Sequence, residues 1–251
     1  MKVIVNGAAG RMGVELLKMV NAGYRGATLA AAVDRETSEG ILGSLSEFDG
    51  SADVLIDFSH HAATPALLEY AKAKRLPVVM CTTGHTCEEI EMIREASKFI
   101  PVFHSGNMSV GVAVLVRLAA DAAAAFPDAD IEIVETHHNR KLDAPSGTAL
   151  MIADGIKNVR PDAYNNCGRS GNGKREPKEI GISAVRRGNI VGIHEVLIST
   201  DTQTLTLKHE AHSRSLFAEG AVAAADFLVN MPAGLYNMED MLAKVSEARK
   251  K

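Results

Sequence analysis

The chain has 251 residues, of which 46% are hydrophobic, and a formal net charge of -4 at pH 7. A chain of this length can bury a large core and divide into about two domains. The acidic balance, the absence of Trp and an aromatic content of 4% disfavour a basic groove with stacking platforms for nucleic acid, so we expect an enzyme that acts on a small molecule.

Targeting and redox signals are weak. No apolar run approaches the roughly 20 residues of a membrane-spanning helix, and the opening "MKVIVNGAAGRMG" turns glycine-rich instead of continuing into a secretory hydrophobic region. We therefore expect a cytoplasmic protein without membrane contact. The spacing of Cys81, Cys87 and Cys167 matches no zinc pattern, which predicts free thiols and no metal site.

Strands and helices alternate over the first hundred or so residues. Short runs rich in β-branched residues predict strands at 3–6, 27–34, 52–59, 76–84 and 100–106, and apolar periodicity predicts helices after residue 10 and over 66–75 and 87–99. This alternation is typical of a parallel, doubly wound α/β sheet.

The pattern changes after a long helix over 111–126. A strand at 129–138, a helix near 147–158 and a Gly- and charge-rich loop at 165–178 precede three β-rich runs at 179–187, 190–200 and 204–213. We expect a second domain with a mixed or antiparallel sheet. The final stretches, 215–230 and 237–251, are predicted helices, and the first is apolar nearly all round and should be buried.

A nucleotide fingerprint lies at the junction of the first strand and helix. Gly7, Gly10 and Gly13 form a G-x-x-G-x-x-G pattern, in which glycines allow close backbone approach to a pyrophosphate at a helix start. Asp34 could accept bonds from the ribose hydroxyls, and Arg35 could pair with a 2'-phosphate, which predicts tolerance of both NADH and NADPH. The alternatives are ordinary turn glycines and an exposed charged pair.

Two further predicted strands end in polar residues. The ligand of an open parallel sheet lies beyond the carboxyl ends of the strands, so Phe58, Ser59, Thr82 and Thr83 are expected to line the cofactor crevice. The adjacent His60 and His61 could suggest a metal, but their side chains point to different faces of any regular element. We expect surface histidines.

The stretch "ETHHNRKLDAPSGTAL", residues 135–150, gathers acid-base and anion-binding signals. Alternation along the strand places Glu135 and His137 on one face and His138 on the other, so the strand must end there if both histidines serve one site. Asp143 or Ser146 can cap the next helix, whose first amides would bind an anion.

With Arg140, Lys141 and imidazoles beside it, this helix start is a receptor for an anion, most plausibly a carboxylate. A histidine that titrates near neutrality also suits proton donation, whereas hydride delivery belongs to a nicotinamide. The alternative is an exposed basic loop followed by a capped helix.

These motifs resemble those of the 4-hydroxy-tetrahydrodipicolinate reductase family, the dihydrodipicolinate reductases of lysine and diaminopimelate biosynthesis. The resemblance runs through the whole chain in "GAAGRMG", "DFS", "CTTG", "SGNMSVG", "ETHHNRKLDAPSGTA", "RRGNIVGIH" and "GLYNMEDML". It implies NAD(P)H-dependent reduction of 4-hydroxy-tetrahydrodipicolinate, a small dicarboxylate, to tetrahydrodipicolinate with loss of water.

The resemblance also implies residue roles. His137 would be the proton donor or acceptor, Lys141 the second catalytic group, and His138, Gly147 and Thr148 would bind the substrate carboxylates. Together with the strand-end residues Phe58 and Ser59, the implied cofactor contacts are Gly7, Ala8, Ala9, Gly10, Arg11, Met12, Asp34, Arg35, Cys81, Thr82, Thr83, Ser105, Gly106, Asn107 and Met108.

The implied architecture is a Rossmann domain of residues 1–108 and 219–251 with a central domain, 109–218, that binds substrate and builds a homotetramer. Cys81 stands where other members carry Gly, and "SGN" stands where some have "AAN", which leaves the choice between NADH and NADPH open.

Two other functions are compatible with part of the sequence. A dehydrogenase of another small amino or dicarboxylic acid would share the nucleotide motif but would not explain the paired histidines. A non-catalytic nicotinamide sensor would need a contact surface for DNA or protein, and the sequence shows no basic recognition helix.

Overall fold

The computed structural model describes residues 1–248, and its backbone packing divides the chain into two compact units. Unit 1 comprises Met1–Ser109 and the chain from Arg214 onward, and unit 2 comprises Val110–Ser213. The chain thus returns to unit 1 earlier than the residue 219 expected from the sequence. The returning helix, α6 (Ser215–Leu228), packs against elements of unit 1.

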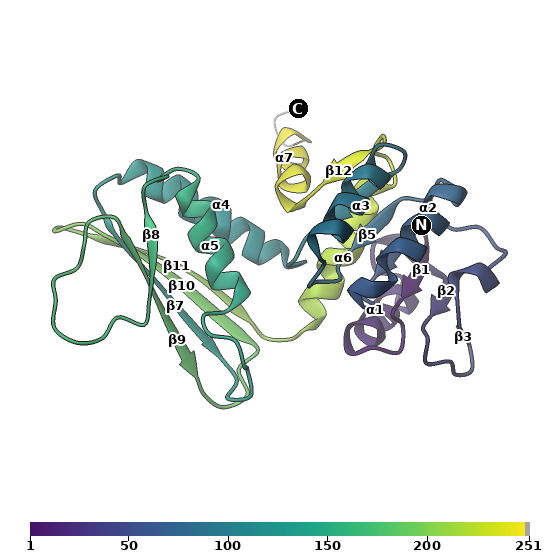
Figure 1. Ribbon diagram of the computed structural model, residues 1–251, viewed down its shortest axis with the longest axis horizontal. Helices are drawn as coiled ribbons and strands as arrows, with labels where there is room; N and C mark the ends of the chain where they lie inside the picture. Colours follow the sequence, from purple (N-terminus) through teal and green to yellow (C-terminus); the bar gives the residue numbers. More distant parts are fainter. Residues whose placement is uncertain (249–251) are drawn as a thin grey trace. The chain divides into compact units, whose positions relative to one another are not determined.

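Unit 1 is built on a seven-stranded sheet in which every neighbouring pair of strands is parallel (Figure 1). The strand order is β12-β6-β5-β4-β1-β2-β3. The strands are β1 (Lys2–Asn6), β2 (Thr28–Val33), β3 (Ile41–Leu42), β4 (Val54–Asp57), β5 (Val78–Met80), β6 (Pro101–His104) and β12 (Gly234–Tyr236). The predicted doubly wound parallel sheet is confirmed, and its strand order reverses between β1 and β4, where such sheets bind ligands.

Helices connect these strands. They are α1 (Arg11–Asn21), α2 (Thr64–Lys74), α3 (Cys87–Ser97), α6 and α7 (Met238–Ala248), with short 3-10 turns at Tyr24–Gly26, Leu45–Glu47 and His61–Ala63. As its apolar sequence predicts, α6 is buried along most of its length, and it packs against α1 and the central strands. No helix within residues 1–248 is long and apolar enough to cross a membrane.

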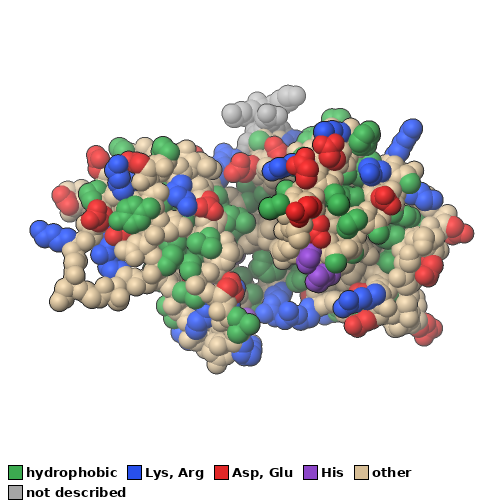
Figure 2. All heavy atoms as spheres, viewed as in Figure 1, with side chains coloured by type: hydrophobic (Ala, Val, Ile, Leu, Met, Phe, Trp, Pro, Cys, Tyr) green, Lys and Arg blue, Asp and Glu red, His purple; other side chains and the backbone are tan. Residues whose placement is uncertain are grey.

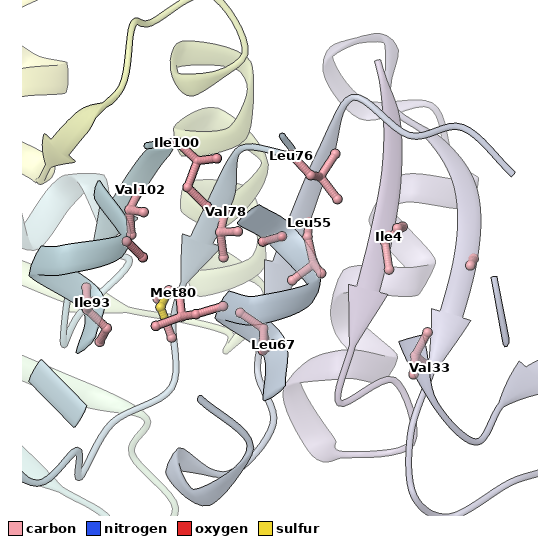
Figure 3. Close-up of a cluster of buried hydrophobic side chains, with 14 residues drawn as sticks. Ile4, Val33, Leu55, Leu67, Leu76, Val78, Met80, Ile93, Ile100 and Val102 are labelled. Atoms are coloured by element: carbon pink, nitrogen blue, oxygen red, sulfur yellow. The ribbon is translucent and has the colours of Figure 1, made fainter. Parts of the chain in front are cut away.

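A row of apolar side chains fixes the sheet of unit 1. Ile4, Leu55, Val78 and Val102 are register partners across four neighbouring strands, and all are completely buried (Figure 3). Leucines and isoleucines from α2 and α3 cover the row. Each fully buried aliphatic side chain stabilises the fold by roughly 1.5–3 kcal/mol, so the carboxyl ends of these strands are held rigidly in place.

Unit 2 contains a five-stranded mixed sheet in the order β11-β10-β7-β9-β8. The strands are β7 (Asp130–His137), β8 (Tyr164–Cys167), β9 (Glu179–Arg186), β10 (Gly192–Ser199) and β11 (Thr204–Ala211). Strand β7 pairs antiparallel with β10 and parallel with β9. Of the two predicted alternatives, a mixed or an antiparallel sheet, the structure has the mixed one; β8 was missed, because it lies almost entirely in the stretch expected to be a loop.

Two helices, α4 (Val110–Ala125) and α5 (Gly147–Lys157), pack on the sheet of unit 2 (Figure 1). Their apolar residues form one buried cluster with Ile131 and Ile133 of β7 and with Val196 and Ile198 of β10. Side chains alternate along a strand, so Glu135 and His137 point to this same face. Over the molecular face in Figure 2, acidic and basic side chains are interspersed with apolar ones.

Candidate active site

Glycines shape the turn between β1 and α1. Gly7 has φ +80°, and an added Cβ there would lie 2.6 Å from the Phe58 carbonyl carbon. At Gly13, a Cβ would lie 2.0 Å from the Gly7 oxygen, so only glycine lets α1 approach the turn this closely. The predicted glycine fingerprint therefore has a steric cause in this structure.

The carboxylate at the end of β2 faces that turn. Asp34 Oδ2 accepts a hydrogen bond from the Ala9 amide at 3.0 Å, and its Oδ1 accepts one from the Glu36 amide at 3.1 Å. These bonds hold the carboxylate beside the glycine turn, whereas Arg35 is exposed. The position is the one in which an acidic residue reaches a ribose in dinucleotide-binding folds.

A cavity of about 860 Å³ opens at this edge of the sheet. The predicted cofactor residues in its lining are Gly7, Ala9, Gly10, Asp34, Arg35, Phe58 and Ser59. Residues that sequence reasoning missed also line it, among them Ser44, Ser46, His60 and Tyr70. Ser44, Ser46 and His60 come from connections between strands and helices, and Tyr70 comes from α2; no local pattern predicts that they meet at this cavity.

The residues present fit a dinucleotide. The cavity combines a glycine-lined helix start with a held carboxylate, and the Ser59 hydroxyl oxygen is buried without a hydrogen-bond partner among residues 1–248. A buried hydroxyl of this kind favours a polar ligand group beside it. The site thus has the size and donor set for a phosphate- and sugar-bearing ligand.

The other predicted cofactor residues lie in unit 1 outside the lining of this cavity. Ala8, Cys81, Thr82 and Met108 are buried, Arg11 and Met12 begin α1, and Thr83, Ser105, Gly106 and Asn107 lie in the turns after β5 and β6. In the last of these turns, the Ser105 hydroxyl donates to the Asn107 carbonyl at 2.7 Å. Close backbone packing at Gly220 of α6, where a Cβ would lie 1.6 Å from the Met108 oxygen, explains the burial of Met108.

Cys81 is turned into the protein. Its side chain is 7% exposed, and its Sγ lies 3.9 Å from the Val79 carbonyl oxygen. Burial, followed by the charge of Asp57, raises the pKa of the thiol well above its ordinary value. The cysteine is therefore a small neutral group at the end of β5.

A buried carboxylate ties three strand ends together. Asp57 is 1% exposed and accepts hydrogen bonds from Asn6 Nδ2 at 2.7 Å, from Thr82 Oγ1 at 2.6 Å and from the Ser59 amide at 3.2 Å. The donors come from the ends of β1, β4 and β5, so one side chain fixes the edge that borders the cavity. Asp57 and Asn6 were not among the predicted site residues.

The two adjacent histidines have separate structural roles. His60 caps the 3-10 turn by accepting from the Ala62 amide at 3.2 Å, and His61 Nδ1 lies 2.9 Å from the Glu89 carboxylate. Within residues 1–248, no group of three or more His, Cys, Asp or Glu side chains could hold a metal ion.

In unit 2, a completely buried carboxylate connects the signature residues. Glu135 Oε2 lies 2.6 Å from His137 Nδ1, and Glu135 Oε1 accepts from the Ser146 amide at 2.9 Å. Arg186 of β9 donates to both carboxylate oxygens at 2.7 Å. Because Glu135 takes Nδ1, the exchangeable ring nitrogen of His137 is Nε2.

The strand β7 ends at His137, and the chain then turns into α5. Ser146 caps α5 by accepting from the Ala149 amide at 3.2 Å, so of the two predicted capping residues it is Ser146 that acts. Gly147 and Thr148 form the first helical turn, and an added Cβ at Gly147 would meet nothing within 4 Å. The open side of Gly147 thus lies at a helix start, the end of a helix that favours an anion.

Two charged residues of this loop are paired with each other. Lys141 Nζ lies 2.8 Å from Asp143 Oδ1, and this hydrogen bond lowers the pKa of the Asp143 carboxyl. The His138 amide donates to the Ile190 carbonyl at 2.8 Å, which anchors the start of the loop.

A second histidine, which sequence reasoning did not select as a site residue, adjoins His137. The His194 ring lies 5.1 Å from the His137 ring, nearly perpendicular to it, and its Nε2 is 3.2 Å from Ser146 Oγ. Burial, with the charge of His137 next, lowers the pKa of His194 to about 4. Gly192 leaves room on the same strand, since a Cβ there would lie 3.1 Å from His137 Nε2.

The network controls the charge of Glu135. Burial raises the pKa of this carboxyl, but hydrogen bonds from Arg186, His137 and the Ser146 amide outweigh it and leave the pKa below its ordinary value. Glu135 is therefore ionised at neutral pH.

A parallel α/β sheet with a glycine-turn cavity, in a chain that also holds a carboxylate-histidine pair beside a helix start, defines an oxidoreductase that uses a nicotinamide dinucleotide. Two family models match the chain, "Dihydrodipicolinate reductase, N-terminus" over residues 1–108 and "Dihydrodipicolinate reductase, C-terminus" over residues 111–242. The chain belongs to the dihydrodipicolinate reductase family.

Curated relatives in this family are similar to the chain over nearly its whole length. The chain is 43% identical to the 4-hydroxy-tetrahydrodipicolinate reductase of Clostridium novyi (strain NT), over 96% of this chain and 98% of the relative. It is 44% identical to that of Caldanaerobacter subterraneus subsp. tengcongensis, over 97% of this chain and 98% of the relative. The dipicolinate-bound dihydrodipicolinate reductase from Paenisporosarcina sp. TG-14 has a similar fold, with a TM-score of 0.77 at 22% identity, covering 94% and 97% of the two chains.

Proposed function

We propose that this chain reduces 4-hydroxy-tetrahydrodipicolinate to tetrahydrodipicolinate, consuming NAD(P)H and a proton and releasing water, in lysine biosynthesis through diaminopimelate. The observation that carries the proposal is the Glu135–His137 pair at 2.6 Å, at the end of the strand β7 that leads through a loop into α5. That segment offers a proton-transfer group and an anion receptor together, which a dicarboxylate substrate of a reduction requires. Family membership gives the reaction its identity.

Unit 1 would bind the cofactor. The bound nicotinamide supplies the hydride. The turn before α1 and the first residues of that helix, from Gly7 to Met12, would bind the pyrophosphate, and Asp34 and Arg35 would contact the adenosine ribose or its phosphate. Ser59, Cys81–Thr83 and Ser105–Met108 would surround the nicotinamide end.

Unit 2 would bind the dicarboxylate. Gly147 and Thr148 amides at the start of α5, with His138, would bind its carboxylates, each charge-assisted bond contributing about 1.5–3 kcal/mol. Lys141 would polarise the substrate, for which it must exchange its bond to Asp143 for one to the substrate.

His137 would transfer the proton from Nε2. The Glu135 carboxylate on Nδ1 would fix the orientation of the ring, so that Nε2 is held in place before the substrate arrives. Gly192 keeps the space beside Nε2 clear. Each of these side chains is placed by strand register, which gives the site rigidity.

The proposal includes a homotetramer in the cytoplasm, for which family likeness is the support. Light scattering coupled to size exclusion tests it directly. A monomer at micromolar concentration would contradict the tetramer and leave the chemistry unaffected.

The activity test follows oxidation of NADH or NADPH with substrate freshly generated by the synthase of the preceding step. His137→Gln and Lys141→Met are expected to lower kcat by roughly 10²- to 10⁴-fold, because proton transfer and polarisation are lost. His212→Gln and Lys98→Met change exposed residues of the same types and serve as controls. Turnover unchanged in both site variants would refute the assignment.

A further inference from the structure

We propose that Arg186 is a positioning residue of this site, which fixes the shared carboxylate of Glu135 and, through it, both His137 and the turn that leads into α5. The inference rests on the proposed role of His137. Arg186 ends β9, and its register partner in β7 is His137. It was not selected from the sequence, because its partner Glu135 lies 51 residues away along the chain.

The geometry is a forked ion pair. Arg186 Nη1 donates to Glu135 Oε2 and Nη2 donates to Oε1, both at 2.7 Å, and the Glu135 side chain is completely buried. Two parallel bonds from a planar guanidinium fix the rotation of the carboxylate as well as its position. Oε2 is also the atom bonded to His137 Nδ1, so the fork sets the direction in which the imidazole is held.

The same guanidinium fixes the turn of residues 143–146 that leads into α5. Its Nη2 donates to the Asp143 carbonyl at 2.7 Å, while Oε1 of Glu135 accepts from the Ser146 amide at 2.9 Å. Both ends of the turn 143–146 are therefore tied to one ion pair. The position of the α5 start relative to His137 depends on that pair.

Charge distinguishes this role from simple packing. The titratable groups that face His137 are Glu135 from β7, Arg186 from β9, His194 from β10, and Lys141 and Asp143 from the loop. His194 is neutral at neutral pH, since burial lowers its pKa to about 4, and Lys141 is paired with Asp143. Arg186 therefore carries the countercharge of Glu135.

Without that countercharge, the full negative charge of Glu135 would act on His137. The imidazolium would be held more tightly and would release its proton less readily to the substrate. Loss of the fork would also free the 143–146 turn and weaken carboxylate binding. A side chain that served only the packing of β9 would affect neither proton release nor substrate affinity specifically.

The test uses Arg186→Met, which removes the charge at similar length, and Arg186→Lys, which keeps the charge without the fork. Arg187→Met is the matched control, since Arg187 is the exposed neighbour on the chain. For Arg186→Met we expect kcat to fall roughly 10- to 100-fold, KM for the substrate to rise, and the alkaline limb of the kcat profile to move up by about one pH unit. Arg186→Lys should restore the limb position but not KM.

A double variant separates this effect from general damage. In a Glu135→Gln background, adding Arg186→Met should no longer move the alkaline limb, because the charge that Arg186 balances is absent. An effect of equal size with and without Glu135 would overturn the proposal. So would an Arg186→Met enzyme with wild-type kcat, KM and pH profile.

An activity-independent measurement distinguishes failure of this inference from failure of the proposed function. The His137 ring is titrated by NMR of histidine-labelled protein, with its signal assigned by its loss in His137→Gln. Arg186→Met should raise the titration midpoint, and an unchanged midpoint would reject the inference even if the wild type reduces another substrate. Wild-type inactivity toward 4-hydroxy-tetrahydrodipicolinate would reject the proposed function alone.

Discussion

Removal of the Asp57 carboxylate should destabilise the chain while its isosteric amide should not. Asp57 accepts two short hydrogen bonds, from Asn6 at 2.7 Å and Thr82 at 2.6 Å, and a longer one from the Ser59 amide at 3.2 Å. In Asp57→Ala, the donors of Asn6 and Thr82 lose their partner in a region that water barely reaches, since their residues are 8% and 5% exposed.

The magnitude follows from opposing terms. Bonds to an ionised acceptor contribute about 1.5–3 kcal/mol each, so the two short bonds are worth roughly 3–6 kcal/mol. All three donors are neutral, and desolvation of a carboxylate costs several kcal/mol, part of which the Ala variant recovers. We therefore expect Asp57→Ala to lower the free energy of unfolding by about 2–4 kcal/mol.

Asp57→Asn should cost about 1 kcal/mol or less, because its oxygen can still accept from Asn6 and Ser59 while its amide donates to the Thr82 hydroxyl. Urea unfolding followed by circular dichroism, at fixed protein concentration, measures both variants. Asp49→Ala, at an exposed position, is the control. An Ala variant within about 0.5 kcal/mol of wild type would refute the view that this carboxylate holds the strand ends together.

Two further predictions concern unit 2. Gly192→Ala should lower kcat by about tenfold or more with little loss of stability, because its Cβ would lie 3.1 Å from His137 Nε2 and displace the ring. Gly173→Ala, where a Cβ meets nothing within 4 Å, is the kinetic control. Equal kcat values for the two variants would count against the proposed position of Nε2. His194 has a folded-state pKa of about 4 against 6.5 unfolded, so the unfolded chain binds the extra proton and stability falls as pH drops from about 6.5 to 4. This loss of stability should reach about 3 kcal/mol and be absent in His194→Gln. If the free energy of unfolding changed with pH equally in the wild type and in His194→Gln across that range, a buried neutral imidazole would be excluded.

The sequence predicts the elements of both units well where patterns are long. The runs around Ile4, Leu55 and Val78 were predicted as strands of a parallel sheet, and the structure has these three side chains fully buried, as is usual for central strands of such a sheet. Edge strands β3 and β12 were missed because they have only two and three residues. Periodicity cannot identify elements so short.

The signature segment was also predictable in part. Alternation along β7 placed Glu135 and His137 on one face, and Ser146, one of the two capping residues predicted for α5, is its N-cap. The partners of that segment were not predictable. Arg186 and His194 reach Glu135 and His137 only because β9 and β10 flank β7 in a particular register. A one-residue shift of β9 would send Arg186 to the other face, and a one-residue shift of β10 would do the same to His194.

By itself, the sequence determined the alternation of strands and helices, the glycine turn before α1 and the residue types that proton transfer and anion binding need. These follow from local backbone preferences and side-chain chemistry. Tertiary structure decided which distant groups donate hydrogen bonds to the two buried carboxylates. Asn6 and Thr82 bind Asp57 in unit 1, and Arg186 binds Glu135 in unit 2. The reason is that strand order and register, which are set by burial of the whole sheet, bring together residues that no local pattern connects.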